Sequence, residues 1–213
     1  MDNSLLVSLS HQLASYRAMD VIANNIANAS TPGYKRETAK FEEFVTYVRP
    51  SETQTGPQAL SFVKDAGAVR DLGQGELNST GATLDFAING KGFFAVQTPA
   101  GIRYTRDGHF TLNQDGQLVT SDGYAVQGDG GAITITPDDG NVSVGADGTI
   151  SSIINGAANQ IAKLQVVTFP DERAMIKQGA NLYSTTQTAR PSTESTVAQR
   201  MLEGSNVKPV IEI

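Results

Sequence analysis

Cysteine and tryptophan are both absent from the 213 residues of this chain. Without cysteine, the chain can form neither a disulfide bond nor a cysteine-ligated metal centre. Histidine is scarce as well, because His11 and His109 lie far apart and no third nitrogen or sulfur ligand is available to them. A zinc site needs several such ligands, so we expect no bound metal and no cofactor.

Positive charge is scarce relative to negative charge. The chain carries 16 Lys and Arg against 22 Asp and Glu, which gives a formal net charge of -6 at pH 7. No basic cluster exceeds Lys35-Arg36, so a nucleic-acid partner is not expected.

Long hydrophobic runs are missing too. None approaches the roughly 20 residues that cross a bilayer, so we expect no membrane insertion. The N-terminus has no basic head, and residues 5–9 are too few and too interrupted by serine for a secretory signal core. Taken alone, these features favour a soluble, cytoplasmic protein without a cleaved signal peptide.

A long N-terminal helix is predicted over residues 3–29. Its apolar residues recur three or four positions apart, and the average step is close to the coiled-coil period. They form one stripe, which consists of Leu6, Leu9, Leu13, Tyr16, Met19, Ala23 and Ile26. Pro32 disfavours helical geometry before it and Gly33 gives free backbone rotation, so the helix ends there. The sequence therefore predicts a helix whose stripe needs a partner.

Three asparagines, Asn24, Asn25 and Asn28, crowd the C-terminal end of this helix. Asparagine is a poor residue for a helix interior, so the group permits two interpretations. In the first, the carboxamides lie at a seam between helices and fix its register. In the second, they only fray and cap the helix end. The residues themselves favour neither interpretation.

The segment after the helix contains three predicted parts. Residues 35–48 are expected to form an irregular or short helical arm, because apolar residues recur there at helical steps. Those residues are Phe41, Phe44, Val45 and Val48. Residues 49–56 are expected to form a mobile loop, either a partner-binding strap or a linker. Residues 58–80 are expected to be mostly extended.

The rest of the chain predicts a small antiparallel β domain. Short alternating apolar runs are separated by glycine-containing dipeptides that are typical of hairpin turns. These dipeptides are Asn89-Gly90, Asp107-Gly108, Asp115-Gly116, Asp122-Gly123, Asp139-Gly140 and Asp147-Gly148. In the run Gly92–Val96, Phe93 and Phe94 should point to opposite faces. The predicted fold is mainly β with an N-terminal α-helix, the β domain being inserted between terminal helical and extended segments.

Candidate catalytic and metal-binding motifs are weak. Asp107 beside His109 suggests acid–base chemistry, but neighbours two apart around an Asp-Gly dipeptide are usually turn residues. Residues 138–141 lack the ligand spacing of a calcium loop. Residues 90–93 lack the glycine spacing of a phosphate loop, and no Gly-x-Ser-x-Gly elbow is present. We therefore predict that the protein is not an enzyme.

Three stretches carry a resemblance to a known family. Residues 23–35 read Ala-Asn-Asn-Ile-Ala-Asn-Ala-Ser-Thr-Pro-Gly-Tyr-Lys, and residues 202–207 read Leu-Glu-Gly-Ser-Asn-Val. Both resemble the terminal motifs of the bacterial flagellar rod and hook proteins. Residues 105–108 and 113–118 add to the match. Within the family, the chain is most similar to the proximal-rod members.

This resemblance implies a structural role. Members of the family stack helically into a hollow basal-body rod that transmits torque through the periplasm and encloses the export channel. Their terminal helices line the inner tube and their β domains form the outer wall. The implied partners are copies of itself, neighbouring proximal and distal rod proteins, and the type III flagellar export apparatus. The family is exported unfolded without a cleaved signal, which overrides the cytoplasmic interpretation above.

The resemblance also implies a domain order and a set of assembly residues. Residues 1–34 form the rod-core helix and its stop, 35–80 an arm and loop, 81–198 the β domain, and 199–213 the start of a C-terminal segment. A C-terminal helix should open at Pro209, and its ending at Ile213 indicates either a truncated sequence or an unusual member. The expected assembly residues are Leu6, Leu9, Leu13, Tyr16, Met19, Asn24, Asn25, Ile26, Asn28, Pro32, Gly33, Leu202, Gly204, Ser205, Asn206 and Val207.

Three alternatives remain at this stage. The first is a distal-rod-type subunit of the same family. The second is a secreted β-rich adhesion or glycan-binding module, whose exposed aromatics would be Phe93, Tyr104 and Tyr124. The third is an enzyme whose site the sequence does not reveal.

Overall fold

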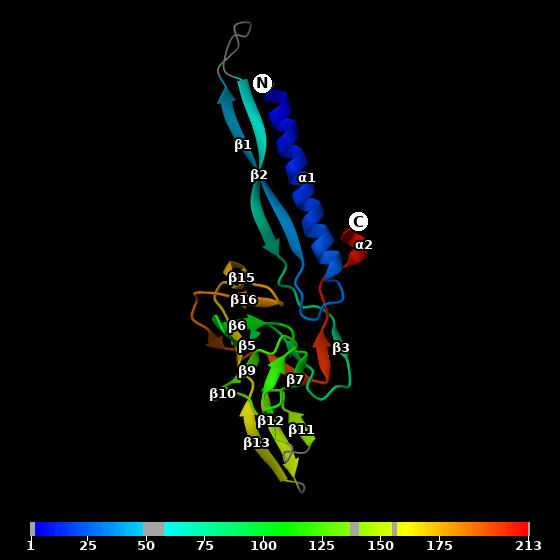
Figure 1. The fold of residues 1–213 in the computed structure, drawn as a ribbon, viewed down its shortest axis with the longest axis vertical. Coiled ribbons are helices and arrows are strands. Elements are labelled where there is room, and N and C mark those ends of the chain that lie inside the picture. The colour runs from blue at the N-terminus through cyan, green and yellow to red at the C-terminus, as the bar shows by residue number, and fades with distance from the viewer. Residues whose placement is uncertain (1–2, 49–57, 137–140, 155–156, 213) are drawn as a thin grey trace. The chain divides into compact units, whose positions relative to one another are not determined.

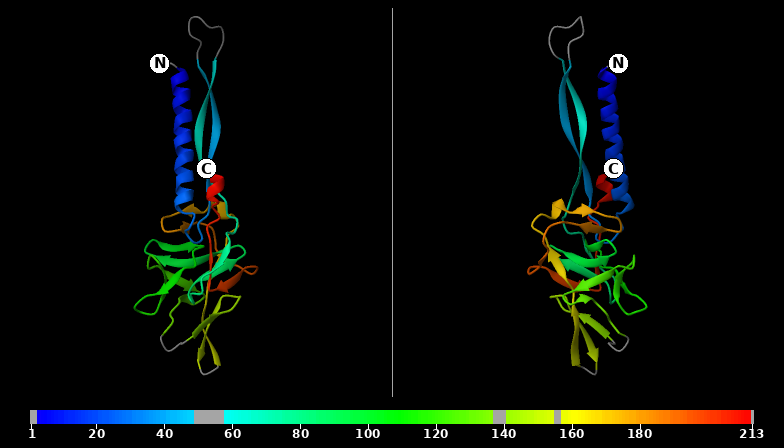
Figure 2. Two further views of the ribbon diagram at one scale, coloured as in Figure 1. Left: turned by 90° about the vertical axis from the view of Figure 1, so that its right-hand side faces the viewer. Right: turned by 60° about the vertical axis from the view of Figure 1, so that its left-hand side comes forward.

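The computed structural model describes residues 3–48, 58–136, 141–154 and 157–212 (Figures 1 and 2). It confirms a mainly β fold with an N-terminal helix. The chain divides into two compact units. Unit 1 contains residues 1–29, 36–71 and 207–213, and unit 2 contains residues 30–35 and 72–206. The predicted loop at 49–56 and the predicted turn at Asp139-Gly140 lie outside the described residues.

Unit 1 consists of a long helix, a two-stranded ribbon and a short helix. Helix α1 spans Asn3–Ala27, which confirms the predicted helix to within two residues at its end. Strands β1 (Glu37–Val48) and β2 (Gln58–Arg70) pair antiparallel, from Glu37 opposite Arg70 to Val48 opposite Gln58. Helix α1 lies alongside this ribbon, and α2 (Pro209–Glu212) begins at the predicted proline (Figures 1 and 2).

The prediction of a helical arm over residues 35–48 is wrong, because most of this segment is strand β1. Its spacing of apolar residues also fits a strand that is apolar on both faces. Phe41 and Val45 share one face of β1, whereas Phe44 and Val48 share the other. Valine, threonine and aromatic residues favour strands, and pairing with β2 satisfies the backbone in a way a short helix would not.

Unit 2 is built around strand β5 (Phe93–Thr98). It pairs antiparallel with β6 (Gly101–Thr105), β9 (Ala125–Gly128) and β14 (Val166–Thr168), in a sheet whose main path runs β15-β16-β6-β5-β9-β8-β7. The remaining elements of unit 2 are β3 (Leu77–Ser79), β4 (Phe86–Asn89), β7 (Phe110–Leu112), β8 (Leu118–Thr120), β10 (Gly131–Ala132), β11 (Asn141–Val144), β12 (Thr149–Ile154), β13 (Ala157–Lys163), the 3-10 turn Glu172–Ala174, β15 (Ile176–Lys177), β16 (Leu182–Ser184), β17 (Arg190–Pro191), β18 (Thr196–Gln199) and β19 (Met201–Glu203).

Three of the predicted hairpins are confirmed. Strands β7 and β8 pair around Asp115-Gly116, β8 and β9 around Asp122-Gly123, and β11 and β12 around Asp147-Gly148. The three glycines have φ angles of 74°, 84° and 81°, a left-handed conformation that glycine adopts without steric cost. Here the turn residues determine the pairing of adjacent strands.

Two predicted hairpins are wrong. After Asn89-Gly90 the chain enters β5, but β4 pairs with β18 instead. Around Asp107-Gly108, β6 pairs with β5 and β16, whereas β7 pairs with β8. The reason at Gly108 is a close backbone crossing: the Phe86 N–H donates to the Gly108 carbonyl at 3.0 Å, so β4 and not β6 is the neighbour there.

The core of unit 2 has two parts, one on each face of β5. The larger cluster contains Phe94, and the smaller contains Phe93, so the prediction that these rings point to opposite faces is confirmed. Phe94 contacts Phe110 edge-on with ring centroids 5.3 Å apart, and Phe93 contacts Tyr183 in the same manner at 5.7 Å. Both faces of this strand are therefore covered from within the same unit.

Unit 2 is closed by pairing between its two chain ends. Strand β18 pairs with β4, and β19 pairs with β3, so residues 196–203 complete sheets begun more than 100 residues earlier. These long-range pairings were not predicted from the sequence. Strand β13 and the β15–β16 pair were also not predicted from the sequence.

Candidate assembly surface and junction cluster

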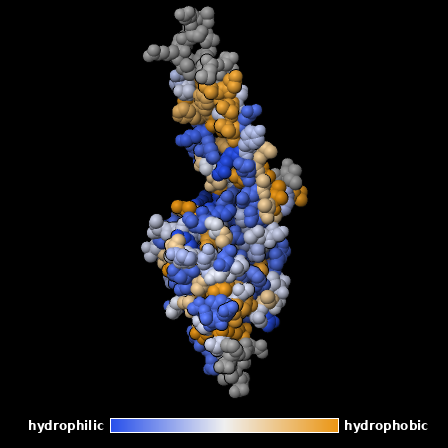
Figure 3. All heavy atoms as spheres, viewed as in Figure 1, coloured by the Kyte–Doolittle hydropathy of each residue, from blue (hydrophilic) through white to orange (hydrophobic). Residues whose placement is uncertain are grey.

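The predicted apolar stripe on α1, called the helix stripe below, is uncovered in unit 1. Leu13, Tyr16 and Met19 are 60%, 64% and 62% exposed, and Leu6, Leu9 and Ile26 are exposed as well. The opposite side of the helix faces the ribbon, where Val21 is buried. Figure 3 also shows hydrophobic residues gathered toward the upper end of the β1–β2 ribbon. An exposed row of large apolar side chains of this length is unusual for a protein that has no binding partner.

Asn25 is fully buried and connects α1 to β1. Its Nδ2 donates to the Glu37 carbonyl at 2.8 Å, and the Glu37 N–H donates to its Oδ1 at 3.0 Å. The carboxamide thus pairs with the strand backbone as a second strand would. Asn28 instead donates to the Asn24 carbonyl at 2.8 Å, the local contact that the capping interpretation expects.

Polar contacts also hold α1 against β2. The Val63 N–H donates to Ser10 Oγ at 3.4 Å, and Arg17 forms an exposed ion pair with Asp65 at 3.4 Å. Exposed ion pairs contribute little stability, so these contacts orient the helix more than they anchor it. The helix stripe remains available on the other side.

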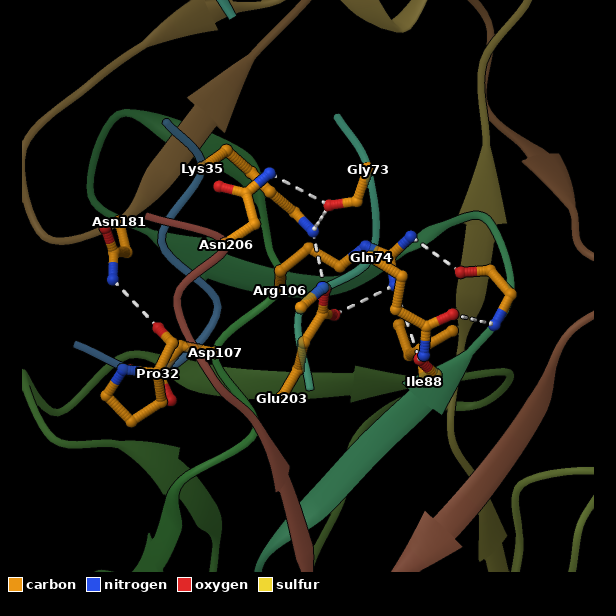
Figure 4. Close-up of polar contacts among 12 residues, drawn as sticks. Pro32, Lys35, Gly73, Gln74, Ile88, Arg106, Asp107, Asn181, Glu203 and Asn206 are labelled. Atoms are coloured by element: carbon orange, nitrogen blue, oxygen red, sulfur yellow. Dashed lines mark hydrogen bonds and ion pairs between the residues drawn. The ribbon is translucent and has the colours of Figure 1, made fainter. Parts of the chain in front are cut away.

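In unit 2, residues 32–35 of the first terminal motif meet residues 203–206 of the second (Figure 4). The Gly33 N–H donates to the Glu203 carbonyl at 2.7 Å, and the Asn206 N–H donates to the Tyr34 carbonyl at 3.4 Å. Gly75 also approaches this place closely, since a Cβ built on it would lie 2.0 Å from the Gly204 carbonyl oxygen. The motifs therefore form one structure although about 170 residues separate them in the sequence.

Three buried charges form the centre of this structure, and we call Lys35, Arg106 and Glu203 the junction cluster. Lys35 Nζ lies 2.5 Å from Glu203 Oε1, and Arg106 Nη1 lies 3.1 Å from Glu203 Oε2. Each residue is at most 4% exposed. The Gly75 N–H donates to Glu203 Oε1 at 2.9 Å, and Lys35 donates to the Gly73 carbonyl at 2.8 Å. Both carboxylate oxygens are thus occupied.

Arg106 extends the cluster to the strand end at Asn89-Gly90. Its Nη2 donates to the Gly90 carbonyl at 2.8 Å, and Gln74 donates from Nε2 to the Ile88 carbonyl at 3.1 Å. The Gly90 N–H donates back to Gln74 Oε1 at 3.1 Å. These side chains take the backbone groups that a hairpin partner would have used, which explains why the predicted β4–β5 hairpin does not form.

The turn between β15 and β16 holds the helix-stop motif from another direction. Asn181 Nδ2 donates to the Pro32 carbonyl at 3.1 Å, and Lys177 Nζ lies 4.3 Å from the centre of the Tyr34 ring. Ala180 and Asn181 have φ angles of 57° and 53°, which non-glycine residues seldom adopt. With this backbone conformation, the Asn181 side chain reaches the Pro32 carbonyl.

The predicted assembly residues thus fall into two places. The stripe and the asparagines belong to unit 1, as does Val207, which is buried. Pro32, Gly33, Leu202, Gly204, Ser205 and Asn206 belong to unit 2 at the junction cluster. Sequence reasoning missed the three charged residues themselves. The sequence did contain a hint of them. The stretches 23–35, 105–108 and 202–207 each contain one of the three residues, and Glu203 is opposite in charge to the other two.

The Asp107–His109 pair is a turn and not an acid–base dyad. The His109 N–H donates to Asp107 Oδ1 at 2.9 Å, whereas the ring Nδ1 lies 2.7 Å from Asp85 Oδ1. Burial raises the pKa of Asp107, against the lowering effect of the His109 hydrogen bond. In the opposite sense, hydrogen bonds from Thr149 lower the pKa of Asp147.

Other predicted features are accounted for by packing. Phe93, one of the aromatics of the glycan-binding alternative, is buried in the smaller core cluster, and Tyr104 packs against that cluster. Within the described residues, no group of three or more acidic, histidine or cysteine side chains is arranged to hold a metal ion. No helix in the described part of the chain combines the length and hydrophobicity needed to cross a membrane.

Comparison with known families agrees with the motifs. A family model described as "Flagella basal body rod protein" matches residues 5–35, and one described as "Flagellar hook protein FlgE/F/G D1 domain" matches residues 87–152. The first covers the helix stripe and the second the centre of unit 2. Together they define the class as rod and hook proteins of the bacterial flagellum.

Individual relatives narrow this class. The flagellar basal-body rod protein FlgF of Caulobacter vibrioides is 46% identical over 216 residues, which cover 100% of this chain and 86% of the relative. FlgF of Mesorhizobium japonicum is 35% identical with the same coverage. FlgG of Buchnera aphidicola subsp. Schizaphis graminum is 36% identical over 230 residues, covering 99% of this chain and 87% of the relative. The chain belongs to the family of flagellar basal-body rod proteins, as the motifs indicated.

Proposed function

We propose that this chain is a structural, non-catalytic subunit of the flagellar basal-body rod, which assembles helically through the helix stripe. The supporting observation is the exposed stripe itself, a row of large apolar side chains with no cover in unit 1. Its partners are copies of the same chain and neighbouring rod proteins, including a distal rod protein of the FlgG type. The subunit leaves the cytosol through the flagellar export apparatus without a cleaved signal, and the assembled rod crosses the periplasm.

The physical argument for assembly is the free energy available from the stripe. Burying one large apolar side chain contributes about 1.5–3 kcal/mol, so six of them contribute on the order of 10 kcal/mol before ordering costs. An isolated helix of this kind is marginal in water and gains its stability from packing. A subunit in a torque-bearing shaft needs many such contacts with its neighbours.

The domain order of the family supports this assignment. Residues 1–34 supply the rod-core helix and its stop, residues 35–80 the arm, residues 81–198 the outer β domain, and residues 199–213 the C-terminal segment. In this arrangement the apolar helix lines the inner tube and the β domain forms the outer wall.

The test is substitution of Leu9, Leu13 and Ile26 by glutamate in a strain that otherwise lacks the gene. We expect loss of swimming and arrest of flagellar assembly at the rod, because buried unpaired carboxylates oppose packing. The matched control replaces exposed polar residues beside the stripe on the same helix, Ser8, His11 and Ser15, by glutamate. Fully motile cells with the stripe variant would contradict the proposal.

A distal-rod position is the second candidate, since FlgG proteins are also similar to this chain over nearly its whole length. Complementation distinguishes the two. Restoration of swimming in a strain lacking its own FlgF, and none in a strain lacking FlgG, supports the proximal position. The reverse result supports the distal one.

A further inference from the structure

We propose that the junction cluster holds the connecting segments of unit 2 in the conformation that the rod subunit needs to function. Glu203, held by Lys35 and Arg106, fixes the backbone of every segment through which the chain enters or leaves unit 2. This inference rests on the proposed function, because it assigns these residues a role in a rod subunit. It goes further in that it separates this role from the stability of the fold.

The first step is topological. The chain enters or leaves unit 2 at three segments, residues 30–35, 72–75 and 203–206. The junction cluster binds all three: Lys35 belongs to the first, its Nζ binds the Gly73 carbonyl of the second, and Glu203 belongs to the third. Asn206 adds a link between the third and the second, because its Nδ2 donates to the Gly73 carbonyl at 3.1 Å.

The second step concerns geometry. Glu203 Oε1 accepts from Lys35 and from the Gly75 N–H, and Oε2 accepts from Arg106. Because three donors bind its two oxygens, the carboxylate is held in one orientation. Its backbone is fixed as well, because β19 pairs with β3 and the Gly33 N–H binds the Glu203 carbonyl. The site therefore imposes a single conformation on the connecting segments.

Burying the three charges of the cluster has a cost in free energy. Removing charges from water costs several kcal/mol for each ion, and apolar residues of equal volume often give equal or greater stability. The cluster contains two cations and one carboxylate, so it carries a net charge of +1 in a buried place. Stability alone does not explain such a group. Conformational specificity does, because charged hydrogen bonds tolerate few alternative arrangements.

The decisive variant is the double substitution Lys35→Met with Glu203→Gln in the full-length chain. It removes one cation and the one anion, so the net buried charge stays at +1. The glutamine oxygen still accepts a hydrogen bond from Gly75 or Arg106, and methionine replaces the lysine stem. Glu203→Gln alone raises the buried charge to +2 and serves as the destabilised comparison. The matched control neutralises an exposed pair, Lys40→Met with Glu42→Gln.

Three measurements are made on each variant: the thermal unfolding midpoint, hydrogen exchange at the Gly33 and Gly75 amides, and swimming in the strain that lacks the gene. We expect the double variant to keep a midpoint near that of the wild type. Exchange at the two glycines should be about tenfold faster, and swimming should be lost. The single variant should have a lower unfolding midpoint and should not swim. The control variant should match the wild type in all three measurements.

A double variant that swims like the wild type would overturn the inference. So would swimming that tracks the unfolding midpoint across all variants, because the cluster would then act only through stability. A failure of the proposed function looks different: the deletion strain itself would swim normally, and the inference would fall with it.

Discussion

At the scale of the residue, two side-chain carboxamides, those of Asn25 and Gln74, take the place of a strand partner for nearby backbone groups. Asn25 replaces a strand partner for Glu37, and Gln74 replaces one for Gly90. In each case one carboxamide donates and accepts at once, which leaves no backbone group of the pair unsatisfied. Asparagine weakens a helix interior, but here Asn25 joins helix α1 to strand β1.

Asn25 provides the first prediction at this scale. Asn25→Ala leaves the Glu37 N–H and carbonyl without this partner, and we expect the contact of α1 with β1 to lose about 1–3 kcal/mol. Hydrogen exchange at the Glu37 amide is the measurement. Asn28→Ala, whose side chain makes a local contact within the helix, is the control. Unchanged exchange at Glu37 would contradict the assigned role.

Asp107 and Asp147 predict opposite responses to pH. The raised pKa of Asp107 means that its charged form destabilises the folded state, so this penalty grows as the pH rises from 3.8 through the raised value. Asp107→Asn should therefore increase stability at pH 7 and have little effect below pH 3.8. The lowered pKa of Asp147 stabilises the folded state above 3.8, and this contribution is lost as the pH falls through the lowered value.

Asp147→Asn should consequently decrease stability at pH 7, in the sense opposite to Asp107→Asn. Urea unfolding of both variants and the wild type at several pH values is the measurement. Each asparagine retains an oxygen that can accept the turn hydrogen bond, so the comparison isolates the charge. Changes of the same sign at pH 7 would refute this account.

At the scale of the element, the sequence predicted those features that depend on neighbouring residues. Apolar residues three or four positions apart predicted α1, and Asp-Gly turns predicted the hairpins around residues 116, 123 and 148, whose glycines are left-handed. The ribbon was missed because apolar residues on both faces of β1 also match a helical period. The two terminal motifs could be recognised from the sequence, but the junction cluster depends on ion pairs between residues 97 and 168 positions apart. Short-range patterns carry no information on such pairs.

The close packing of Gly108 explains why the Asp107-Gly108 dipeptide does not form a hairpin, and substitution of this glycine tests the explanation. A Cβ built on Gly108 would lie 1.6 Å from the Phe86 carbonyl oxygen, where β4 crosses. We expect Gly108→Ala to destabilise unit 2 by about 3 kcal/mol, since the backbone must move. Gly130→Ala is the control, because nothing lies within 4 Å of its Cβ position. Equal unfolding midpoints for the two variants would argue against the close crossing.

Helix α1 gives a prediction for the isolated protein. Apart from Val21, its described apolar residues are partly or fully exposed, so little holds the helix in the absence of neighbours. We expect a monomer in dilute solution whose α1 amides exchange rapidly while those of β5 are protected. Light scattering and hydrogen exchange are the measurements. A protected α1 in a dilute monomer would show that the stripe is covered within the chain and would weaken the assembly proposal.

At the scale of the whole molecule, the pairing of chain ends determines how unit 2 can fold. Hairpins such as β7–β8–β9 need only local contacts, but β4–β18, β3–β19 and the pair of Lys35 with Glu203 join residues more than 100 positions apart. Long-range pairing forms late because its loop-closure entropy must be overcome first. The junction cluster is therefore completed only when residue 203 is in place.

This order predicts different kinetic effects of two core substitutions. Val197 lies in β18 and Leu118 in β8, and both belong to the larger core cluster. Val197→Ala should cost about 2 kcal/mol and Leu118→Ala about 3 kcal/mol. If the local hairpins form first, Leu118→Ala slows folding, whereas Val197→Ala mainly accelerates unfolding. Stopped-flow circular dichroism suits a chain without tryptophan. Slower folding of the Val197 variant would instead place the chain-end closure in the folding nucleus, and the junction cluster would then form early.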